Sequence, residues 1–343
     1  MNTMTRPAAR VPARLAIAAL ALGTLGAVGA PATAAQAQAQ TQAQAQAQAQ
    51  ARAGAHDMIR YASVKGCLDK EYGNTPCGSW RLSMHSGKVM PLSDALVWPR
   101  DAKGKSVTYM AAPIAVSGDG RSVAYFRKSD RRLVVREVGG AVHVMPRIKG
   151  LSMVSAGISL SQDGGHLLLD YYDAKDDRQP SRVYDVSDPG QGTALPAAAV
   201  NASFSGDGES VLAELGTEDN TTALVAYDSS GTELARIEPP QVVVNNSPRA
   251  LSSDGRTVAV FAGSSLKLYD MATDQLVRSL RVKLPGKTAP YMVDWTGEHE
   301  VTVHIDRGKS MWIGEFDTET GAGKVRDTYS LPKDAYTFAA CGG

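Results

Sequence analysis

The sequence has few of the residues from which metal centres are built. It holds three cysteines and six histidines among 343 residues. No two histidines have the H-x-H or H-E-x-x-H spacing, and no cysteine has a histidine or a second cysteine beside it at ligand spacing. We therefore expect no metal ion and no other cofactor.

Catalytic signatures are also missing. The nearest approach to a serine-hydrolase elbow is GISLS at residues 157–161, which lacks the second glycine. Although the chain has 33 glycines, none forms a phosphate-binding loop or a dinucleotide fingerprint after a strand. The absence of an assembled motif favours a protein that binds over one that catalyses.

Acidic residues are absent from the N-terminal region. Residues 1–53 contain four of the 36 Lys and Arg residues and none of the 35 Asp and Glu residues. Arg6, Arg10 and Arg14 precede an apolar run at 15–29, and Ala-Thr-Ala follows at 32–34. This order predicts a signal peptide over residues 1–34 and hence a secreted protein, because small residues follow the apolar run as in cleaved signals. The alternative is a retained N-terminal anchor.

Residues 35–55 alternate alanine and glutamine and carry no large apolar side chain. Such a segment buries too little surface to offset its ordering entropy, so we interpret it as a linker. The remaining chain has 32 basic and 35 acidic residues, a net charge of −3. That charge gives no support for nucleic-acid binding, and no further stretch is long enough to predict a transmembrane segment.

A repeated turn motif occupies most of the remaining chain. Its serine, acidic residue and glycine recur with acidic positions spaced by 44, 44, 47 and 44 residues. The clear copies carry Asp119-Gly120, Asp163-Gly164, Asp207-Gly208 and Asp254-Gly255, and a decayed copy has Glu298. Gly, Asp and Ser dominate tight turns for backbone reasons, so we interpret these residues as structural. A period of 40 to 50 residues is typical of a four-stranded propeller blade.

Each turn lies between short apolar segments, and an aromatic–acidic pair often ends the next one, as in Tyr184-Asp185 and Tyr269-Asp270. This pattern resembles the WD-like repeat of TolB-type propellers over residues 115–330. The resemblance implies an exported, non-catalytic β-propeller that binds a protein or another ligand of the cell envelope. We also expect the chain to be a monomer.

A sixth blade is predicted from the two ends of the domain. Residues 80–87 and 88–92 have the pattern of a third and a fourth strand, but the first two strands are not in their usual place. Residues 336–340 are strand-like and unassigned, and pairing them with the N-terminal blade would remove both sheet edges. We therefore predict an all-β domain over residues 56–343 with six blades, five of them clear repeats and one composite, and no substantial helix.

The cysteines suggest one disulfide bond. Cys67 and Cys77 flank a turn-rich segment at 69–76, and export favours oxidation. We predict a Cys67–Cys77 bond with Cys341 unpaired. Sequence does not fix connectivity, and Cys341 could instead fasten the C-terminal tail to the N-terminal segment.

The charged clusters have ordinary explanations. The acidic run at 170–177 lacks the spacing of a calcium loop, and we interpret it and the basic run at 127–132 as solvated hairpin tips. His299 and His304 are predicted to lie on a turn and a strand, as ordinary residues of those elements.

Two classes of function remain, because a propeller supports both binding and catalysis. For binding, the connections between blades are the candidates, since they vary far more than the repeated turns: residues 93–107, 150–156, 239–248 and 285–290. Trp98 and Tyr291 are the predicted partner-binding anchors. The alternative is a hydrolase or lyase, which a cluster of carboxylates or histidines with shifted pKa values at the channel mouth would favour.

Overall fold

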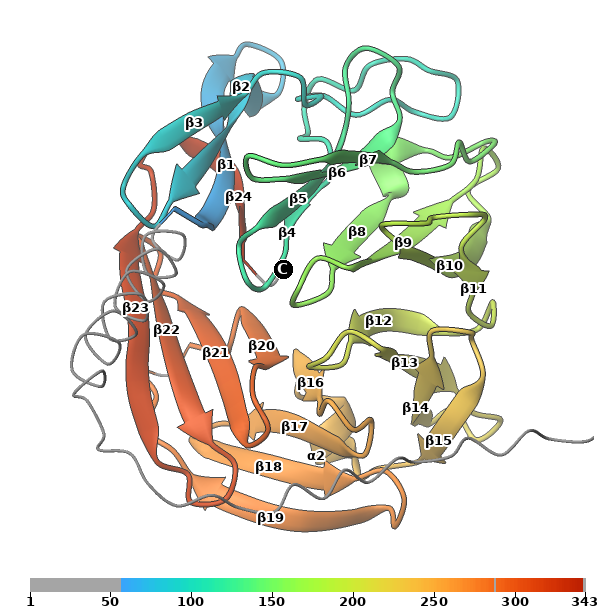
Figure 1. The fold of residues 1–343 in the computed structure, drawn as a ribbon, viewed down its shortest axis with the longest axis vertical. Coiled ribbons are helices and arrows are strands. Elements are labelled where there is room, and N and C mark those ends of the chain that lie inside the picture. Colours follow the sequence, from blue (N-terminus) through green and yellow to red (C-terminus); the bar gives the residue numbers. More distant parts are fainter. Residues whose placement is uncertain (1–56, 287, 342–343) are drawn as a thin grey trace, which may run out of the picture. The chain divides into compact units, whose positions relative to one another are not determined.

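The computed structural model describes residues 57–286 and 288–341. The predicted signal peptide and linker lie outside the described residues. The chain divides into two units, Met1–Ala51 and Arg52–Gly343, and the second contains everything described below. In this second unit, six four-stranded antiparallel sheets follow one another around a ring, as predicted (Figure 1).

Blade I combines both ends of the domain, and blades II and III follow it along the chain. Blade I consists of β24 (Ala335–Ala340), β1 (Ile59–Asp69), β2 (Gly73–Met84) and β3 (Val89–Leu92). Blade II, the first clear repeat, consists of β4 (Ile114–Val116), β5 (Ser122–Phe126), β6 (Leu133–Glu137) and β7 (Val142–Val144). Blade III consists of β8 (Gly157–Leu160), β9 (His166–Tyr172), β10 (Arg178–Asp185) and β11 (Thr193–Ala194).

Blades IV, V and VI are built from consecutive strands in the same order. Blade IV consists of β12 (Val200–Phe204), β13 (Ser210–Gly216), β14 (Thr222–Asp228) and β15 (Glu233–Ile237). Blade V consists of β16 (Arg249–Leu251), β17 (Thr257–Ala262), β18 (Ser265–Asp270) and β19 (Gln275–Arg281). Blade VI consists of β20 (Met292–Trp295), β21 (Glu300–Asp306), β22 (Ser310–Asp317) and β23 (Gly323–Ser330).

The only helices among the described residues are short and lie in connections. They are the 3-10 helix η1 (Met153–Ser155) and the α-helix α2 (Gln241–Val244). No helix in the described part of the chain is long and apolar enough to cross a membrane.

The burial of the strands follows from the packing of one blade on the next. Every residue of β5 is buried, because both of its faces are covered by neighbouring blades. The outermost strand β19 is almost entirely exposed. This explains why the second strands read as continuous apolar runs while the fourth strands are polar.

Blade I closes the ring through non-covalent pairing of the chain ends. Strand β24 pairs with β1 over Tyr61↔Ala340 to Val64↔Thr337 (Figure 1). The expectation that two strands are displaced was wrong, since only the first strand comes from the C-terminal end. Strand β1 escaped notice because register shifts between Ile59 and Tyr61 and between Ser63 and Lys65 interrupt its alternation.

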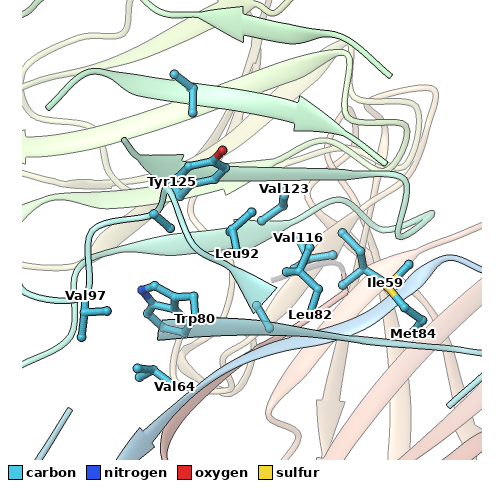
Figure 2. Close-up of a cluster of buried hydrophobic side chains, with 13 residues drawn as sticks. Ile59, Val64, Trp80, Leu82, Met84, Leu92, Val97, Val116, Val123 and Tyr125 are labelled. Atoms are coloured by element: carbon cyan, nitrogen blue, oxygen red, sulfur yellow. The ribbon is translucent and has the colours of Figure 1, made fainter. Parts of the chain in front are cut away.

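An apolar cluster joins blades I and II (Figure 2). Trp80 on β2 is buried in it, and its indole Nε1 donates to the backbone oxygen of Leu96 over 2.9 Å. Leu96 belongs to the connection of residues 93–113 between blades I and II. The cluster therefore fixes one part of that long connection to the rigid ring.

The antiparallel order gives the ring two different ends. One end carries the connections between blades and the hairpins that join second and third strands, and we call it the connection face. The other end carries the Ser-x-Asp-Gly turns and the hairpins that join third and fourth strands, and we call it the turn face.

Candidate functional site

The repeated turns form the same hydrogen-bond network in four blades. In blade II, Ser117 Oγ donates to Asp119 Oδ1 over 2.7 Å and accepts the N–H of Ser122 over 2.9 Å. The same Asp119 oxygen accepts the N–H of Arg121 over 2.9 Å. Gly120 has a φ of 70°, and a Cβ there would collide with the backbone of Ile59.

The corresponding bonds recur in blades III, IV and V. Their serine–aspartate and glycine residues are Ser161, Asp163 and Gly164; Ser205, Asp207 and Gly208; and Ser252, Asp254 and Gly255. In the decayed copy, Thr296 and Thr302 instead share one hydroxyl–hydroxyl bond of 2.9 Å. The polar groups of the four clear turns are used within the turns themselves, which supports their predicted structural role.

The acidic hairpin tip of blade III is also satisfied internally. Asp173 Oδ1 accepts the N–H groups of Lys175 and Asp177 over 2.8 and 3.2 Å. No group of three or more His, Cys, Asp or Glu residues in the described part of the chain could hold a metal ion. These carboxylates therefore have a local use.

Cys67 and Cys77 form a disulfide bond with their Cα atoms 5.8 Å apart. The bond lies across the hairpin of β1 and β2, whose turn is shorter than predicted because residues 73–76 already belong to β2. Cys341 is free and lies beside Val116 of β4, and its N–H donates to the carbonyl of Arg60 on β1 over 3.2 Å. The termini are thus joined by strand pairing, and the disulfide instead braces a hairpin of the connection face.

This braced hairpin carries half-exposed aromatic side chains together with the 93–113 connection. Trp98 is 39% exposed, and its Nε1 donates to the Pro76 oxygen over 2.8 Å. Tyr72, at the hairpin tip, is 50% exposed and packs on Tyr109, which is 48% exposed, with ring centroids 5.3 Å apart. Each ring has one side held by the protein and the other in solvent, the arrangement found in aromatic residues that bind partners.

Tyr291 extends this group at the start of β20. It is 43% exposed and stacks on Phe338 of β24 with centroids 5.5 Å apart. Two residues away on β24, the Tyr336 hydroxyl donates to the Tyr109 backbone oxygen over 2.9 Å. Strand β24 therefore contacts both Tyr291 and the segment that carries Tyr109. We call Tyr72, Trp98, Tyr109 and Tyr291 the aromatic surface.

Sequence reasoning selected Trp98 and Tyr291 but missed Tyr72 and Tyr109. The predicted recognition loop at residues 239–248 was less well chosen. Val243 in that loop is buried, and Arg249 donates to the backbone oxygens of Val243 and Val244 over 3.4 and 2.5 Å. The loop is therefore part of the framework between blades IV and V.

A cavity of about 230 Å³ lies where blade VI meets blades I and II, is lined also by Gln162 of blade III, and opens toward the turn face. Blade VI lines it with Asp294, Thr302, His304 and Arg326. A register shift between β22 and β23 at Ile313 and Gly314 leaves Arg326 without a strand partner, and its guanidinium donates to Thr302 Oγ1 of β21 over 3.3 Å. We call this space the seam cavity.

Burial shifts the pKa values of two side chains in the seam cavity, Asp294 and His304. It raises the pKa of the Asp294 carboxyl to about 8, although the Arg326 guanidinium acts in the opposite direction. Burial, with a smaller contribution from Arg326, lowers the pKa of His304 to about 3. Both groups are therefore neutral near pH 7. His304 Nε2 lies 3.9 Å from Asp294 Oδ2, and His304 Nδ1 has no hydrogen-bond partner in the described chain.

This pair could give and take a proton, because protonated Asp294 is a donor and neutral His304 has an acceptor nitrogen. The Cys341 thiol also lines the cavity, but burial raises its pKa to about 11, so it is not a ready nucleophile. Sequence reasoning treated His304 as an ordinary strand residue. Asp294 and His304 come close because Asp294 of β20 pairs with Thr302 of β21, two residues before His304. This register cannot be read from the sequence.

No protein-family model matches this chain, and no curated protein matches it. Among solved structures, TolB from Acinetobacter baumannii matches over 81% of this chain and 67% of its own, with 17% identity and a TM-score of 0.40. A chain of the nidogen–laminin complex matches over 81% and 97%, with 12% identity and a TM-score of 0.41.

Prolyl oligopeptidase B from Galerina marginata matches over 79% of this chain and 41% of its own, with 15% identity and a TM-score of 0.46. Likenesses of this size concern the fold alone. The fold that the TolB resemblance implies, a β-propeller, is the one that this chain has, and its six four-stranded blades are closed by β24 and β1.

Proposed function

We propose that this protein is an exported, non-catalytic propeller that binds a protein partner through the aromatic surface of its connection face. The observation that carries the proposal is the half-exposure of Tyr72, Trp98, Tyr109 and Tyr291 on one end of the ring. Aromatic side chains with one side fixed lose little conformational entropy on binding and contribute large apolar contacts.

Two features support this choice of face. The disulfide braces the hairpin that carries Tyr72, and the Trp98 indole is held by the Pro76 oxygen. A surface held in its final geometry binds with a smaller entropic cost than a mobile one. On the turn face, by contrast, the repeated side chains already bind one another.

Export is the second part of the proposal, and it rests on the order of basic, apolar and small residues in positions 1–34. N-terminal sequencing of the protein from the culture medium or cell envelope should give a first residue between about 35 and 56. Intact Met1 on soluble intracellular protein would contradict it.

Site-specific photocrosslinking in the producing organism tests the binding site. A photoreactive phenylalanine derivative replaces Tyr72 in the full-length protein, and a matched variant carries it at Arg256, which is exposed on the turn face. We expect a discrete crosslinked partner from position 72 and none from position 256. Equal crosslinking from both positions, or none from either, would contradict the proposed function.

Truncation of the anchor sharpens the test. Trp98→Ala should reduce recovery of the position-72 partner at least tenfold, because an interface aromatic contributes more than about 1.4 kcal/mol when it is a hot spot. The melting temperature should fall by only a few degrees, because the indole is 39% exposed and loses one hydrogen bond, to the Pro76 oxygen. An unchanged yield would show that Trp98 lies outside the interface.

A second candidate function is hydrolase or lyase activity in the seam cavity, and the Asp294–His304 pair is the observation that favours it. Its test is turnover of ester, amide, glycoside and uronide substrates by the purified protein. Activity that Asp294→Asn and His304→Gln each remove would support this function. Activity that both variants keep would place the chemistry elsewhere.

A further inference from the structure

A second pocket lies on the connection face, between blades II and III. Its volume is about 170 Å³, and its walls are mainly apolar side chains from both blades. They include Phe126, Leu133, Met145, Met153 and Leu169. This volume is below the ~300–1,000 Å³ of pockets that hold drug-sized ligands, and it suits one bulky side chain.

The rim of this pocket is cationic. Arg131, Arg132 and Arg147 line it, together with Asp130. Asp130 is already paired with Arg127 over 2.5 Å, and Arg132 donates to the Met145 oxygen over 3.0 Å. Arg131 and Arg147 have neither an ion pair nor a side-chain hydrogen bond within the described residues. Two guanidinium groups beside the opening are thus available to carboxylates.

The wall of the pocket includes a buried residue with an unsatisfied polar group. Tyr184 lines the pocket and is buried, and its hydroxyl has no hydrogen-bond partner within the described chain. Burial raises its pKa to about 12, so the hydroxyl stays protonated. A buried hydroxyl without a partner costs free energy, which a bound polar hydrogen or acceptor would recover.

The pocket is connected to the aromatic surface by the 93–113 segment. The Arg100 oxygen of that segment accepts the N–H of Met153 over 2.9 Å. Gly104 of the same segment lies beside Arg131, since a methyl group added at its Cα would be 3.5 Å from Arg131 Nη1. One continuous segment therefore runs from Trp98 to the rim of the pocket.

We propose that this pocket receives a tryptophan or tyrosine side chain from the partner protein, flanked there by Asp or Glu residues that pair with Arg131 and Arg147. The inference rests on the proposed function and specifies the chemistry of the partner. The aromatic body packs against the apolar walls, and its N–H or O–H offers the buried Tyr184 hydroxyl the partner that it lacks. The carboxylates supply charge complementarity at the rim.

A short peptide tests this chemistry without a known partner. The probe is a fluorescein-labelled, terminally blocked Asp-Glu-Trp-Glu-Asp, and its binding to the full-length protein is followed by fluorescence polarisation. We expect saturable binding that weakens with salt and is at least tenfold weaker when Trp is replaced by Ala or the acidic residues by Lys. No binding at millimolar protein, or equal binding of the three peptides, would overturn the proposal.

Matched variants locate the binding. Arg147→Glu should weaken binding of the acidic peptide at least tenfold, whereas Arg256→Glu, the same charge change on the turn face, should leave it unchanged. Tyr184→Phe should weaken it about three- to tenfold. Tyr227→Phe is its control, because the Tyr227 hydroxyl is equally unpartnered but lies outside this pocket. Equal effects within either pair would overturn the assignment.

Two further outcomes are decisive. If free indole-3-acetate binds as tightly as the peptide, the flanking contacts contribute nothing and the occupant is a small molecule instead of a protein segment. If position-72 crosslinking to the partner survives Arg147→Glu and Tyr184→Phe, the pocket is not used and the proposed function stands. Absence of that crosslink in the otherwise unaltered protein removes the proposed function itself, whatever the peptide does.

Discussion

The two ends of the ring use their polar and aromatic groups in different ways. On the turn face, the serine and aspartate side chains of four blades bind one another and the turn backbone. On the connection face, four tyrosine and tryptophan rings are half in solvent, and two arginines have no partner among the described residues. From this contrast we infer that the turns maintain the ring, and we place the proposed binding site among the connections.

The comparison is not a simple division into ordered and variable loops. Residues 239–248 lie on the connection face, yet Val243 is buried and Arg249 binds two carbonyl oxygens there. The seam cavity lies toward the turn face, yet its Asp294 and His304 are not satisfied by each other. Each of these exceptions gives an experiment.

The largest effect is expected from replacing residues 239–248 with a Gly/Ser segment of equal length. The exchange removes the buried Val243 side chain and disturbs the carbonyl acceptors of Arg249, whose guanidinium is buried beside Glu214. We expect the free energy of unfolding to fall by about 4 kcal/mol. Urea denaturation measures it. Replacement of the exposed tip at residues 218–220 is the control, with a change below about 0.5 kcal/mol.

If the 239–248 exchange leaves stability unchanged, the loop is free and belongs with the recognition segments after all. That result would restore the simpler contrast between two uniform faces.

The second effect concerns the brace of the aromatic surface. The double variant Cys67→Ala/Cys77→Ala should lose about 3 kcal/mol of stability, because the disulfide closes a loop between residues 10 apart in sequence. The ring should still form, since β24 and β1 pair without it. Cys341→Ala, which removes a thiol that makes no disulfide bond, is the comparison variant. Similar losses of stability from the double variant and from Cys341→Ala would show that the effect does not come from the disulfide.

The third prediction concerns pH and the seam cavity. Asp294 has a folded pKa raised to about 8, so the stability that its protonation provides is lost as pH rises from about 4 to 8. His304 has a folded pKa lowered to about 3, so the stability linked to it is lost as pH falls from about 6.5 to 3. The two effects oppose each other between about pH 4 and 6.5.

Between pH 6.5 and 8, only Asp294 contributes. We therefore expect the free energy of unfolding to fall by up to about 2 kcal/mol across this window, and Asp294→Asn to remove the fall. Urea titrations at several pH values measure it. A flat profile in the unaltered protein would mean that the folded pKa of Asp294 is not raised into this window.

The smallest effect is expected on the turn face. Ser205→Ala removes the acceptor of the Ser210 N–H and the donor to Asp207, and should cost about 1 to 1.5 kcal/mol. Thr296→Ala in the decayed turn should cost less, since that hydroxyl shares only one bond. Thermal unfolding of the two variants measures this difference. Neither change should alter crosslinking from position 72, and a loss of crosslinking would move the binding site to the turn face.

Sequence alone determined the architecture, because the repeated turn is a local feature. Ser, Asp and Gly at fixed offsets provide the hydrogen bonds and backbone conformation of a tight turn within a few residues. Ser117, Asp119 and Gly120 therefore predict their turn without knowledge of the rest of the chain. The regular spacing of four such turns and one decayed copy then fixed the number of clear blades. Strand β1 was missed because bulges break its alternation.

Tertiary structure alone decided which side chains meet. Tyr72 and Tyr109 are far apart in sequence, and their contact depends on how the 93–113 connection folds over the β1–β2 hairpin. The pocket of Arg131, Arg147 and Tyr184 forms between two blades, and the Asp294–His304 pair depends on strand register. A turn is determined by a few consecutive residues and can be predicted from them. Contacts between distant segments depend on how the blades pack, which no single stretch of sequence determines.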